Sequence, residues 1–354
     1  MTVDTEQRRD IHVALAGYGF AGRTFHAPLI HSVAGLRLHS VISTDSTRVA
    51  RDWPDIPVVT YDAALADPSV DLIVIATPHA AHAQMALRAI EAGKHVVIEK
   101  PMAVSDEEAE SLCALAARAG TVATVFHSRR WDADFLTLRA ILAERMLGRV
   151  VQFESRFDRY RPVVRDRWRE RPGPGAGTWF DLGAHLVDQA LHLFGEPLRI
   201  DAELSSERSA SAATDFFHVR LHYEDLRVVL ESSSLAAEPG PRFRVLGTDG
   251  TYTKFGVDPQ EEALRVGTRP LTEASWGEDR RPGLLTRIAD GKAVAREVPN
   301  VRGNYAAFYV GVRQAIHQVV AAPPVTFPEA ARVVRALVLA ERCAREGREL
   351  SWTP

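Results

Sequence analysis

The segment Ala14-Leu15-Ala16-Gly17-Tyr18-Gly19-Phe20-Ala21-Gly22 joins a short apolar run to a stretch with helical periodicity. Its three glycines have the spacing of the phosphate-binding turn that follows the first strand of a Rossmann domain. Gly17 permits a tight turn, Gly19 lets the backbone approach a pyrophosphate, and Gly22 lets the helix pack closely against the strand. The amides of the helix N-terminus favour the negative charge of a pyrophosphate. We therefore predict a dinucleotide site; the alternative is a Rossmann-like domain that has lost its ligand.

Short apolar runs alternate with longer amphipathic stretches around this turn, as in a parallel sheet with crossover helices. Runs rich in Val and Ile predict strands at residues 11–16, 38–42, 72–76, 95–98 and 122–126. Helical spacing of apolar residues predicts helices at 22–33, 80–92 and 106–119. Ser105 and Glu108 have the spacing of a capping box at the start of the last of these helices. The predicted fold class is α/β, with an N-terminal Rossmann domain on a doubly wound parallel sheet.

This alternation stops near residue 127, where we place a domain boundary within 127–132. A helical stretch at 133–145 is followed by period-2 segments such as 150–156 and 216–232. Strands without intervening helices usually pair as an antiparallel sheet. Two helical segments at 305–320 and 328–345 close the chain. We predict a Rossmann domain at 1–127 and an α+β domain at 128–354, with the option that the last helix packs back on the N-terminal domain.

Length and composition agree with two globular domains and exclude several classes of protein. The chain has 354 residues, more than an ordinary single core holds. Its net charge is −3, and no basic block interleaved with aromatic residues argues for nucleic acid. Cys113 and Cys343 lie far apart in helical segments, which argues against a disulfide. Residues 1–10 are polar without an export signal, and no apolar stretch is long enough to span a bilayer, so we expect a cytoplasmic protein with no membrane partner.

The end of the second predicted strand bears on the choice of dinucleotide. NAD enzymes usually place a carboxylate there for the adenosine 2′-hydroxyl, whereas this strand ends in Ser43 and Thr44, with Arg48 following. A hydroxyl and a guanidinium suit a 2′-phosphate. Asp45 keeps NAD open, because a small shift in register would bring its carboxylate to the ribose. We expect NADP, with NAD as the alternative; Arg48 would otherwise be a solvated helix residue.

Several motifs further along the chain carry a resemblance to a known family. Gly93-Lys94-His95-Val96-Val97-Ile98-Glu99-Lys100-Pro101 and the segments 76–82 and 181–188 resemble, in the same order, the Gfo/Idh/MocA oxidoreductases, the glucose-fructose oxidoreductase and inositol dehydrogenase family. Segments 126–131, 157–162 and 303–305 are similar to a cytoplasmic branch that includes NADP-linked scyllo-inositol dehydrogenase. The resemblance covers nearly the whole chain. It implies that the second domain binds substrate on a large open, mainly antiparallel sheet, whose far face makes a homodimer or homotetramer.

The glycine turn, the end of the second strand and the resemblance together give a set of predicted cofactor contacts. These are Gly17, Gly19, Phe20, Ala21, Gly22, Ser43, Thr44, Arg48, Thr77, Pro78, His79, His82, Glu99 and Lys100. His79 departs from the family pattern, in which an asparagine is common after Thr-Pro, so the detail of its contact near the cofactor is left open.

Interconversion of a secondary alcohol and a ketone needs a group that takes and returns the hydroxyl proton near the working pH. Histidine meets this need without strong perturbation, and His185 follows Asp181 by four residues, on the same helical face. Asp181 would orient the imidazole or bind a substrate hydroxyl. By resemblance the catalytic lysine of the family falls on Lys100, at a strand end, where an ammonium stabilises developing negative charge. The sequence does not divide proton transfer between Lys100 and His185. A surface lysine and a helix cap with a satisfied histidine are the alternative.

Polar and aromatic residues in segments expected to flank the same cleft are the predicted substrate contacts. These are His127, Arg130, Trp131, Arg159, Tyr160, Asp181, His185 and Tyr305. Simple packing is the alternative for Trp131 and Tyr160. The alternating arginines of segment 165–171 are interpreted as a solvated or interface face, with attraction of an acidic substrate as the alternative. We expect no metal, because hydride transfer requires none and no third ligand stands out beside Asp181 and His185.

Together these inferences predict an NADP-preferring, NAD-tolerant dehydrogenase or reductase that acts on the CH–OH group of a sugar or cyclitol. Two alternatives stay open, because the family fold also serves them. One is a regulator that binds the cofactor without turnover, and the other is a glycosidase that uses bound NAD for transient oxidation. The presence of Lys100, Asp181 and His185 together argues against the regulator.

Overall fold

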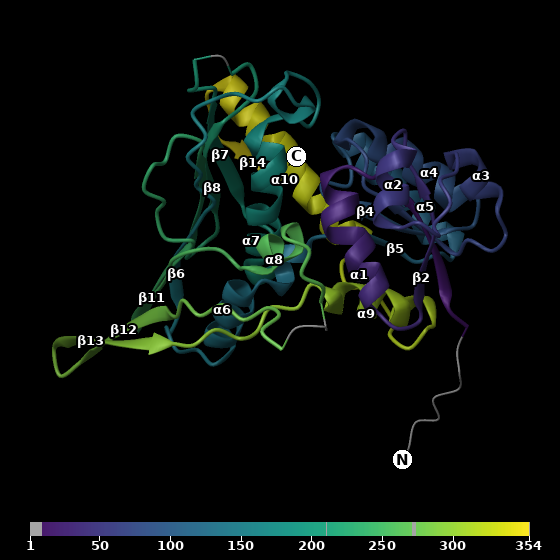
Figure 1. Cartoon of the computed structure of the whole chain (residues 1–354). Helices are drawn as coiled ribbons and strands as arrows, with labels where there is room; N and C mark the ends of the chain where they lie inside the picture. The colour runs from purple at the N-terminus through teal and green to yellow at the C-terminus, as the bar shows by residue number, and fades with distance from the viewer. Residues whose placement is uncertain (1–8, 210, 271–273, 354) are drawn as a thin grey trace.

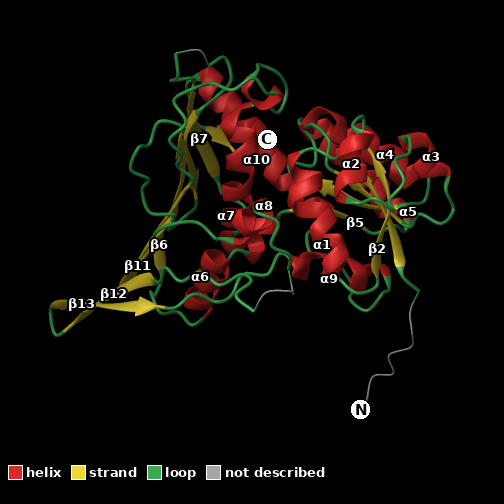
Figure 2. Ribbon diagram, in the orientation of Figure 1, coloured by secondary structure: helices red, strands yellow, loops and turns green. Residues whose placement is uncertain are grey.

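The computed structural model describes residues 9–209, 211–270 and 274–353. The chain forms two parts, each built on one sheet, with helices packed between and around them (Figures 1 and 2). The first five strands make a sheet in the order β2-β1-β3-β4-β5, and nine later strands make a second sheet. The α/β fold class, with a Rossmann sheet and a second, larger sheet, is confirmed.

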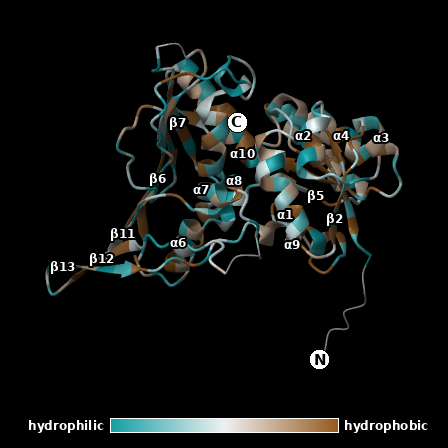
Figure 3. Ribbon diagram, viewed as in Figure 1, coloured by the Kyte–Doolittle hydropathy of each residue, from teal (hydrophilic) through white to brown (hydrophobic). Residues whose placement is uncertain are grey.

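Every pairing in the first sheet is parallel. Its strands are β1 (Ile11–Ala16), β2 (Leu36–Ile42), β3 (Leu72–Ile75), β4 (His95–Glu99) and β5 (Ala123–Phe126), all within two residues of their predicted bounds. β3 and β5 are buried at every residue, as expected for strands covered by helices on both faces, and the strands are largely hydrophobic (Figure 3). The order of strands reverses direction between β1 and β3, and such a switch point is where doubly wound sheets bind ligands.

The helices of this part differ from the prediction in three places. The predicted helix at 22–33 starts with a π-helical turn, η1 (Gly22–His26), before α1 (Ala27–Ser32). A 3-10 turn, η2 (His79–Ala81), precedes α4 (His82–Glu91), whereas α5 (Asp106–Ala119) has its predicted bounds. The short helices α2 (Ser46–Asp52) and α3 (Tyr61–Ala66) were not predicted. They are too short for a clear apolar period, although Asp45 and Thr60 cap them with side-chain oxygens.

The second sheet has the order β13-β12-β11-β10-β6-β9-β8-β7-β14, and its pairings are antiparallel except for β6 with β9. Its strands are β6 (Val150–Arg156), β7 (Arg199–Ser205), β8 (Phe216–His222), β9 (Arg227–Ser233), β10 (Phe243–Gly247), β11 (Gly250–Lys254), β12 (Gly283–Ala289), β13 (Lys292–Val298) and β14 (Leu350–Ser351). The segment predicted as one strand at 216–232 is a hairpin of β8 and β9. A turn closed by the Tyr223 amide and the Leu226 carbonyl interrupts it.

Two further helices, α6 (Ala133–Ala143) and α7 (Ala184–Phe194), contribute to the core of this part, whereas α8 (Gln260–Arg265) contacts η1 and places Leu264 in the core of the Rossmann part. Two helices near the C-terminus join the two parts of the molecule. α9 (Ala306–Ile316) packs against α1, and its aromatic residues Phe308 and Tyr309 enter the core of the Rossmann part. α10 (Phe327–Glu346), the long yellow helix of Figure 1, contacts α5 as well as β7 and α7. The last helix thus packs back on the N-terminal part, and two late helices cross the boundary that we predict near residue 127.

Within the described ranges no helix combines the length and apolar character needed to cross a bilayer. The expectation of no export signal rests on the polar residues 1–10. Of these, residues 1–8 lie outside the described residues.

Candidate functional site

A cavity of about 1020 Å³ lies between the two parts of the molecule. On the Rossmann side it is lined by the glycine turn after β1 and by the residues that follow β2, β3 and β4. On the other side it is lined by the loop after β5, by the loop of residues 159–169, by the start of α7 and by α8. The carboxyl ends of the parallel strands therefore open into a space that the C-terminal half closes.

The glycine turn has the geometry that a bound pyrophosphate needs. Gly17 has a φ of +99°, and a Cβ built there would lie 2.5 Å from the carbonyl oxygen of Ala76. A Cβ at Gly22 would lie 1.9 Å from the Gly17 oxygen, so only glycine lets this helix approach the turn. At Gly19 a Cβ would meet nothing within 4 Å. The space beside Gly19 belongs to the cavity, and the turn fits the phosphate groups of a dinucleotide.

The residues after β2 line the other end of this dinucleotide groove. Ser43, Thr44, Asp45 and Arg48 all line the cavity. The Asp45 carboxylate accepts the Arg48 amide at 3.0 Å and pairs with the Arg48 guanidinium at 3.0 Å. Asp45 is thus occupied as the cap of α2, and Arg48 stands beside it with almost half of its side chain exposed.

Lys100, Asp181 and His185 line the same cavity. Lys100 follows β4, and its Nζ donates to the Asp181 carbonyl at 2.7 Å and to Asp181 Oδ1 at 3.1 Å. Asp181 lies in the π-helical turn η5 (Trp179–Gly183) that leads into α7, which begins just before His185. The side chain of Lys100 is only 8% exposed, so these contacts fix the ammonium.

The charges of this group set the protonation of its members. Burial alone would raise the pKa of Asp181, but the charges of Lys100 and Arg169 outweigh it and hold that pKa well below its usual value. Burial, with the positive charge of Lys100, lowers the pKa of His185 well below its usual value. Asp181 is therefore a carboxylate and His185 a neutral imidazole at neutral pH. Such an imidazole has a free nitrogen for a proton, but the lowered pKa makes it a weaker base than the unperturbed histidine expected from the sequence.

Two histidines after β3 organise the cavity from the Rossmann side. His82 lies between the carbonyl oxygens of Pro101 (Nδ1, 2.7 Å) and Thr77 (Nε2, 2.9 Å), which ties the loop after β3 to the loop after β4. His79 Nδ1 lies 2.8 Å from the Gly175 oxygen, and its ring meets that of Trp168 edge-on at 4.7 Å. His79, where the family commonly has asparagine, therefore links the Rossmann part to the loop at 168–175.

The predicted cofactor residues other than Gly22 all line the cavity, and Gly22 packs on the Gly17 carbonyl instead. Glu99 also has an internal role, since it accepts the Lys100 amide at 2.9 Å and contacts His26 at 3.2 Å. The roles of these residues in cofactor binding stay predictions, and the cavity that they share is the basis for the proposal below.

The predicted substrate residues fall into two groups, those that line the cavity and those that do not. Arg159, Asp181 and His185 line the cavity, and five others do not: His127, Arg130, Trp131, Tyr160 and Tyr305.

These five side chains have other surroundings. Arg130 is buried and pairs with Asp188 and Glu329, at 2.7 and 2.9 Å. Tyr305 is fully buried and donates to Asp132 at 2.7 Å. His127 is buried, Trp131 packs edge-on against Phe308, and Tyr160 is 60% exposed. The short turn η3 (Ser128–Trp131) explains the division, because it carries Ser128 and Arg129 into the cavity wall while Arg130 points into the interior.

Several residues that line the cavity, most of them basic, are not among the predicted cofactor or substrate contacts. Arg129, Arg161, Arg165, Arg167, Trp168, Arg169 and Glu261 all line the cavity. Of the four alternating arginines, Arg165, Arg167 and Arg169 line the cavity, and Arg165 is exposed there, so both the solvated face and the attraction of an acidic substrate stay predictions for them. Arg171 lies outside the lining, is exposed and pairs with Asp166 at 2.6 Å. A 3-10 turn at Trp168–Glu170 interrupts this segment, so a period-2 pattern does not explain why these side chains face the cavity.

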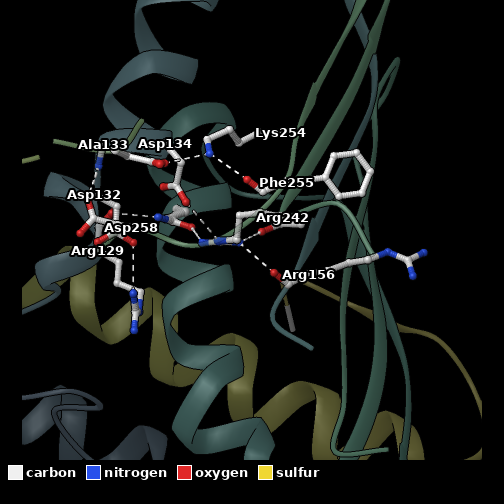
Figure 4. A network of polar contacts seen from close by, with 12 residues as sticks. Arg129, Asp132, Ala133, Asp134, Arg156, Arg242, Lys254, Phe255 and Asp258 are labelled. Carbon is white, nitrogen blue, oxygen red and sulfur yellow. Dashed lines mark hydrogen bonds and ion pairs between the residues drawn. The ribbon is translucent and has the colours of Figure 1, made fainter. Parts of the chain in front are cut away.

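A buried polar network supports the wall of the cavity at Arg129 (Figure 4). Arg129 pairs with Asp132 at 3.2 Å and with Glu261 at 2.6 Å. Deeper inside, Arg242 lies 3.7 Å from Asp134, whose pKa is raised to about 7 by burial and by the charge of Asp132. These ion pairs hold Arg129 in place while leaving it at the cavity surface.

One group elsewhere has the donor atoms of a metal site. Asp201, His222 and Glu349 place one ligand atom each within 4.8 Å of one another. They lie at the edge of the second sheet and do not line the cavity. Their carboxylates already pair with arginines, Asp201 with Arg220 at 2.9 Å and Glu349 with Arg199 at 2.6 Å.

Comparison with known proteins places this geometry in a family. Residues 11–127 match the model described as the NAD-binding Rossmann fold of an oxidoreductase family, and residues 139–352 match its C-terminal alpha/beta domain. The oxidoreductase YdgJ of Escherichia coli is 49% identical over 87% of this chain and 89% of its own length. The NADP(+)-linked scyllo-inositol 2-dehydrogenase IolW of Bacillus subtilis is 37% identical, over 96% of this chain and 95% of its own.

Solved structures agree with these relatives. The oxidoreductase yvaA from Bacillus subtilis superposes with a TM-score of 0.93 at 36% identity, covering 97% of this chain and 98% of the other. The oxidoreductase YPO2259 from Yersinia pestis gives a TM-score of 0.92 at 46% identity, covering 97% of each chain. With a dinucleotide-binding turn, a lysine at the end of β4 and both domain models matched, the chain belongs to the Gfo/Idh/MocA oxidoreductase family.

Proposed function

We propose that the chain is an NADP-preferring dehydrogenase or reductase that interconverts a secondary alcohol and a ketone on a sugar or cyclitol. The observation that carries the proposal is the group at the end of β4. Lys100 is clamped against Asp181 in the same cavity that His185 and the glycine turn line. A fixed ammonium, a carboxylate and a neutral imidazole beside a dinucleotide groove are what alcohol oxidation requires.

The glycine turn would hold the pyrophosphate, and the loops after β3 and β4 would hold the nicotinamide end. When bound, the nicotinamide dinucleotide supplies the acceptor or donor of the hydride. The protein's own residues bind and orient the substrate oxygen. Lys100 has three N–H donors and uses two of them on Asp181, so one is left for that oxygen.

We assign the transfer of the hydroxyl proton to His185. Its neutral state lets it accept the hydroxyl proton in alcohol oxidation and return it in ketone reduction. Its Nδ1 is buried without a hydrogen-bond partner among the described residues. Asp181 then serves mainly to position Lys100, because its carboxylate and its carbonyl both accept from that ammonium.

The preference for NADP rests on the residues after β2. Arg48 lines the groove, and the carboxylate of Asp45, which lines it too, already pairs with Arg48. A guanidinium beside the hydroxyls of Ser43 and Thr44 suits a 2′-phosphate. The relative IolW, named for NADP(+), supports the same choice.

A homo-oligomer and a cytoplasmic location complete the proposal. Helices α7 and α10 pack on one face of the second sheet, and Figure 1 shows its other face turned away from the rest of the chain. We propose this outer face as the contact between copies, in a dimer or tetramer, and the oligomeric state in sedimentation experiments tests it.

The experiment that tests the activity is a panel of inositols, aldoses and ketoses, together with their carboxylate and phosphate derivatives, assayed with NADP(H) and NAD(H) and followed by the absorbance of reduced nicotinamide. Binding of NADPH, measured by its fluorescence, is scored separately. Net turnover with NADP supports the proposal. Cofactor binding without net turnover on any panel member would favour the regulator or the glycosidase, and the absence of cofactor binding would overturn the whole proposal.

A further inference from the structure

The wall of the cavity opposite the Rossmann part carries more positive than negative charge. Seven arginines line it: Arg129, Arg159, Arg161, Arg165, Arg167, Arg169 and Arg265, the last of which pairs with Glu262 at 2.9 Å. The carboxylates that line the same wall are Asp181 and Glu261, of which Asp181 accepts from Lys100 and Glu261 pairs with Arg129. A neutral sugar or cyclitol needs no such excess of cations.

The arginines differ in how their charges are compensated. Arg129 has two carboxylate partners, Arg167 pairs with Glu170 at 2.6 Å, and Arg169 lies 3.6 Å from Asp181. For Arg159 and Arg161 no carboxylate oxygen lies within 4 Å among the described parts of the chain.

Both of these unpaired side chains are only partly exposed to water. Burial lowers the pKa of Arg159 to about 10, and the charge of Asp181 offsets this only in part. Burial and the charge of Arg167 likewise lower the pKa of Arg161. Half-buried guanidinium groups without a counter-ion cost folding free energy unless a bound anion compensates them.

A small pocket of about 20 Å³ opens beside the main cavity, where it shares Arg159, Arg161, Arg167, Arg169 and Asp181 with it. The polar residues that complete its lining are Thr178, Thr214 and Ser234 with their hydroxyl groups, and Arg208 and Glu170. The Glu170 carboxylate is already paired, with Arg167 at 2.6 Å and with Arg208 at 3.0 Å. This volume has room for one group the size of a water molecule or of a single anionic oxygen. Guanidinium forks and hydroxyls around such a space are the donors that carboxylate and phosphate oxygens prefer.

The position of Arg159 is fixed by packing. Its guanidinium lies 5.0 Å from the centre of the Phe157 ring, which Arg129 also covers, at 4.6 Å. Phe157 is itself buried, so the ring is a firm support. Because Asp181 lines both spaces, the small pocket lies next to the group that we propose to hold the reacting oxygen.

We infer that the substrate is an acidic sugar or polyol derivative, whose carboxylate or phosphate binds Arg159 and Arg161 while its reacting CH–OH group lies at Lys100 and His185. This inference rests on the proposed function and names its substrate class. One ligand would then place its anionic group at the arginines and its reacting carbon beside Lys100 and His185. A carboxylate and a phosphate share the chemistry that these arginines recognise.

The first test uses thermal unfolding of the full chain saturated with NADPH. D-Gluconate and D-glucuronate provide carboxylates, D-glucose 6-phosphate provides a phosphate, and D-glucose is the neutral parent, all at matched ionic strength. A ligand that binds the folded state raises Tm. We expect a larger rise with at least one acidic compound than with D-glucose, and the compound that gives it identifies the anion. Equal shifts for acidic and neutral compounds would overturn the inference.

The second test uses variants and turnover. In Arg161→Ala we expect kcat/KM for the acidic compound, relative to that for its neutral parent, to fall about ten- to a hundredfold, the worth of one charge-assisted contact. Arg171→Ala is the matched control, because it removes a loop arginine that pairs with Asp166 and lines neither space. An unchanged ratio in Arg161→Ala, or weaker NADPH binding without a changed ratio, would overturn the inference. The proposed function fails separately, if NADPH alone neither binds nor raises Tm.

Discussion

The two ends of the cavity are built by different means. On the Rossmann side the contacts come from backbone turns, and at Gly17 and Gly22 neighbouring backbone atoms leave no room for a Cβ. On the other side they come from long side chains on loops, such as Arg129 and Arg159, whose directions depend on distant partners. Local sequence therefore determines the dinucleotide groove, whereas tertiary packing determines the substrate end.

Lys100 joins these two ends, because it follows a Rossmann strand and donates to Asp181 on the other side. We expect Lys100→Ala to lower kcat about 10²- to 10⁴-fold, since the oxygen-binding ammonium is lost. NADPH affinity, measured by fluorescence, should change far less. Lys292→Ala, in the exposed hairpin of β12 and β13, is the control. A kcat for Lys100→Ala near that of the unmodified enzyme would refute the assignment.

The buried ion pairs behind the substrate end offer a second test. Arg130 is 6% exposed and pairs with Asp188 and Glu329, which lie on α7 and α10. We expect Arg130→Ala to lower the free energy of unfolding by about 3–5 kcal/mol, because it leaves the buried Asp188 carboxylate without its partner. Urea unfolding measures this.

The matched comparison is Arg165→Ala, whose side chain is exposed at the cavity surface. There we expect a change in unfolding free energy of no more than about 0.5 kcal/mol. Similar losses in the two variants would contradict the distinction between arginines that support the wall and arginines that face the cavity. If Arg130→Ala does not accumulate in folded form, Arg130→Lys provides a milder version of the same loss.

The distance along the chain between interacting residues explains which features could be predicted from the sequence. The strands of the first sheet, the helix α5 and the glycine turn follow from short-range patterns, because period, caps and glycine spacing are local properties. The assignment of Arg130 and Tyr305 to substrate failed to anticipate Asp188 and Asp132, which take up these side chains. Asp188 lies 58 residues from Arg130 and Asp132 lies 173 residues from Tyr305. No local pattern reveals a partner at such a distance.

The burial of His127 predicts a pH dependence of stability. It is buried, and burial lowers its pKa to about 4, with the charge of Asp188 opposing this and that of Arg130 adding to it. In the unfolded chain His127 therefore binds a proton near pH 6.5, whereas in the folded chain it binds one only near pH 4. The contribution of His127 to stability is complete above pH 6.5 and falls by about 3 kcal/mol as the pH drops through that window.

Urea unfolding at several pH values checks this. In His127→Gln we expect a shallower loss of stability between about pH 6.5 and pH 4, since one titrating group is gone. An identical pH dependence in the variant and the unmodified protein would show that His127 protonates in the folded state, as a residue open to the cavity would.

The smallest expected effect lies at the far end of the dinucleotide groove. In Arg48→Ala we expect the Kd for NADP to rise about tenfold, because one charge-assisted contact to the 2′-phosphate is lost. The Kd for NAD should hardly change or should improve, since Asp45 is then freed from its ion pair. Arg51→Ala is the control, on the same helix but paired with Asp52 and outside the cavity lining. Equal weakening of both coenzymes would mean that Arg48 supports the helix and not the phosphate. In that case even the Rossmann end would depend on tertiary context at its edge.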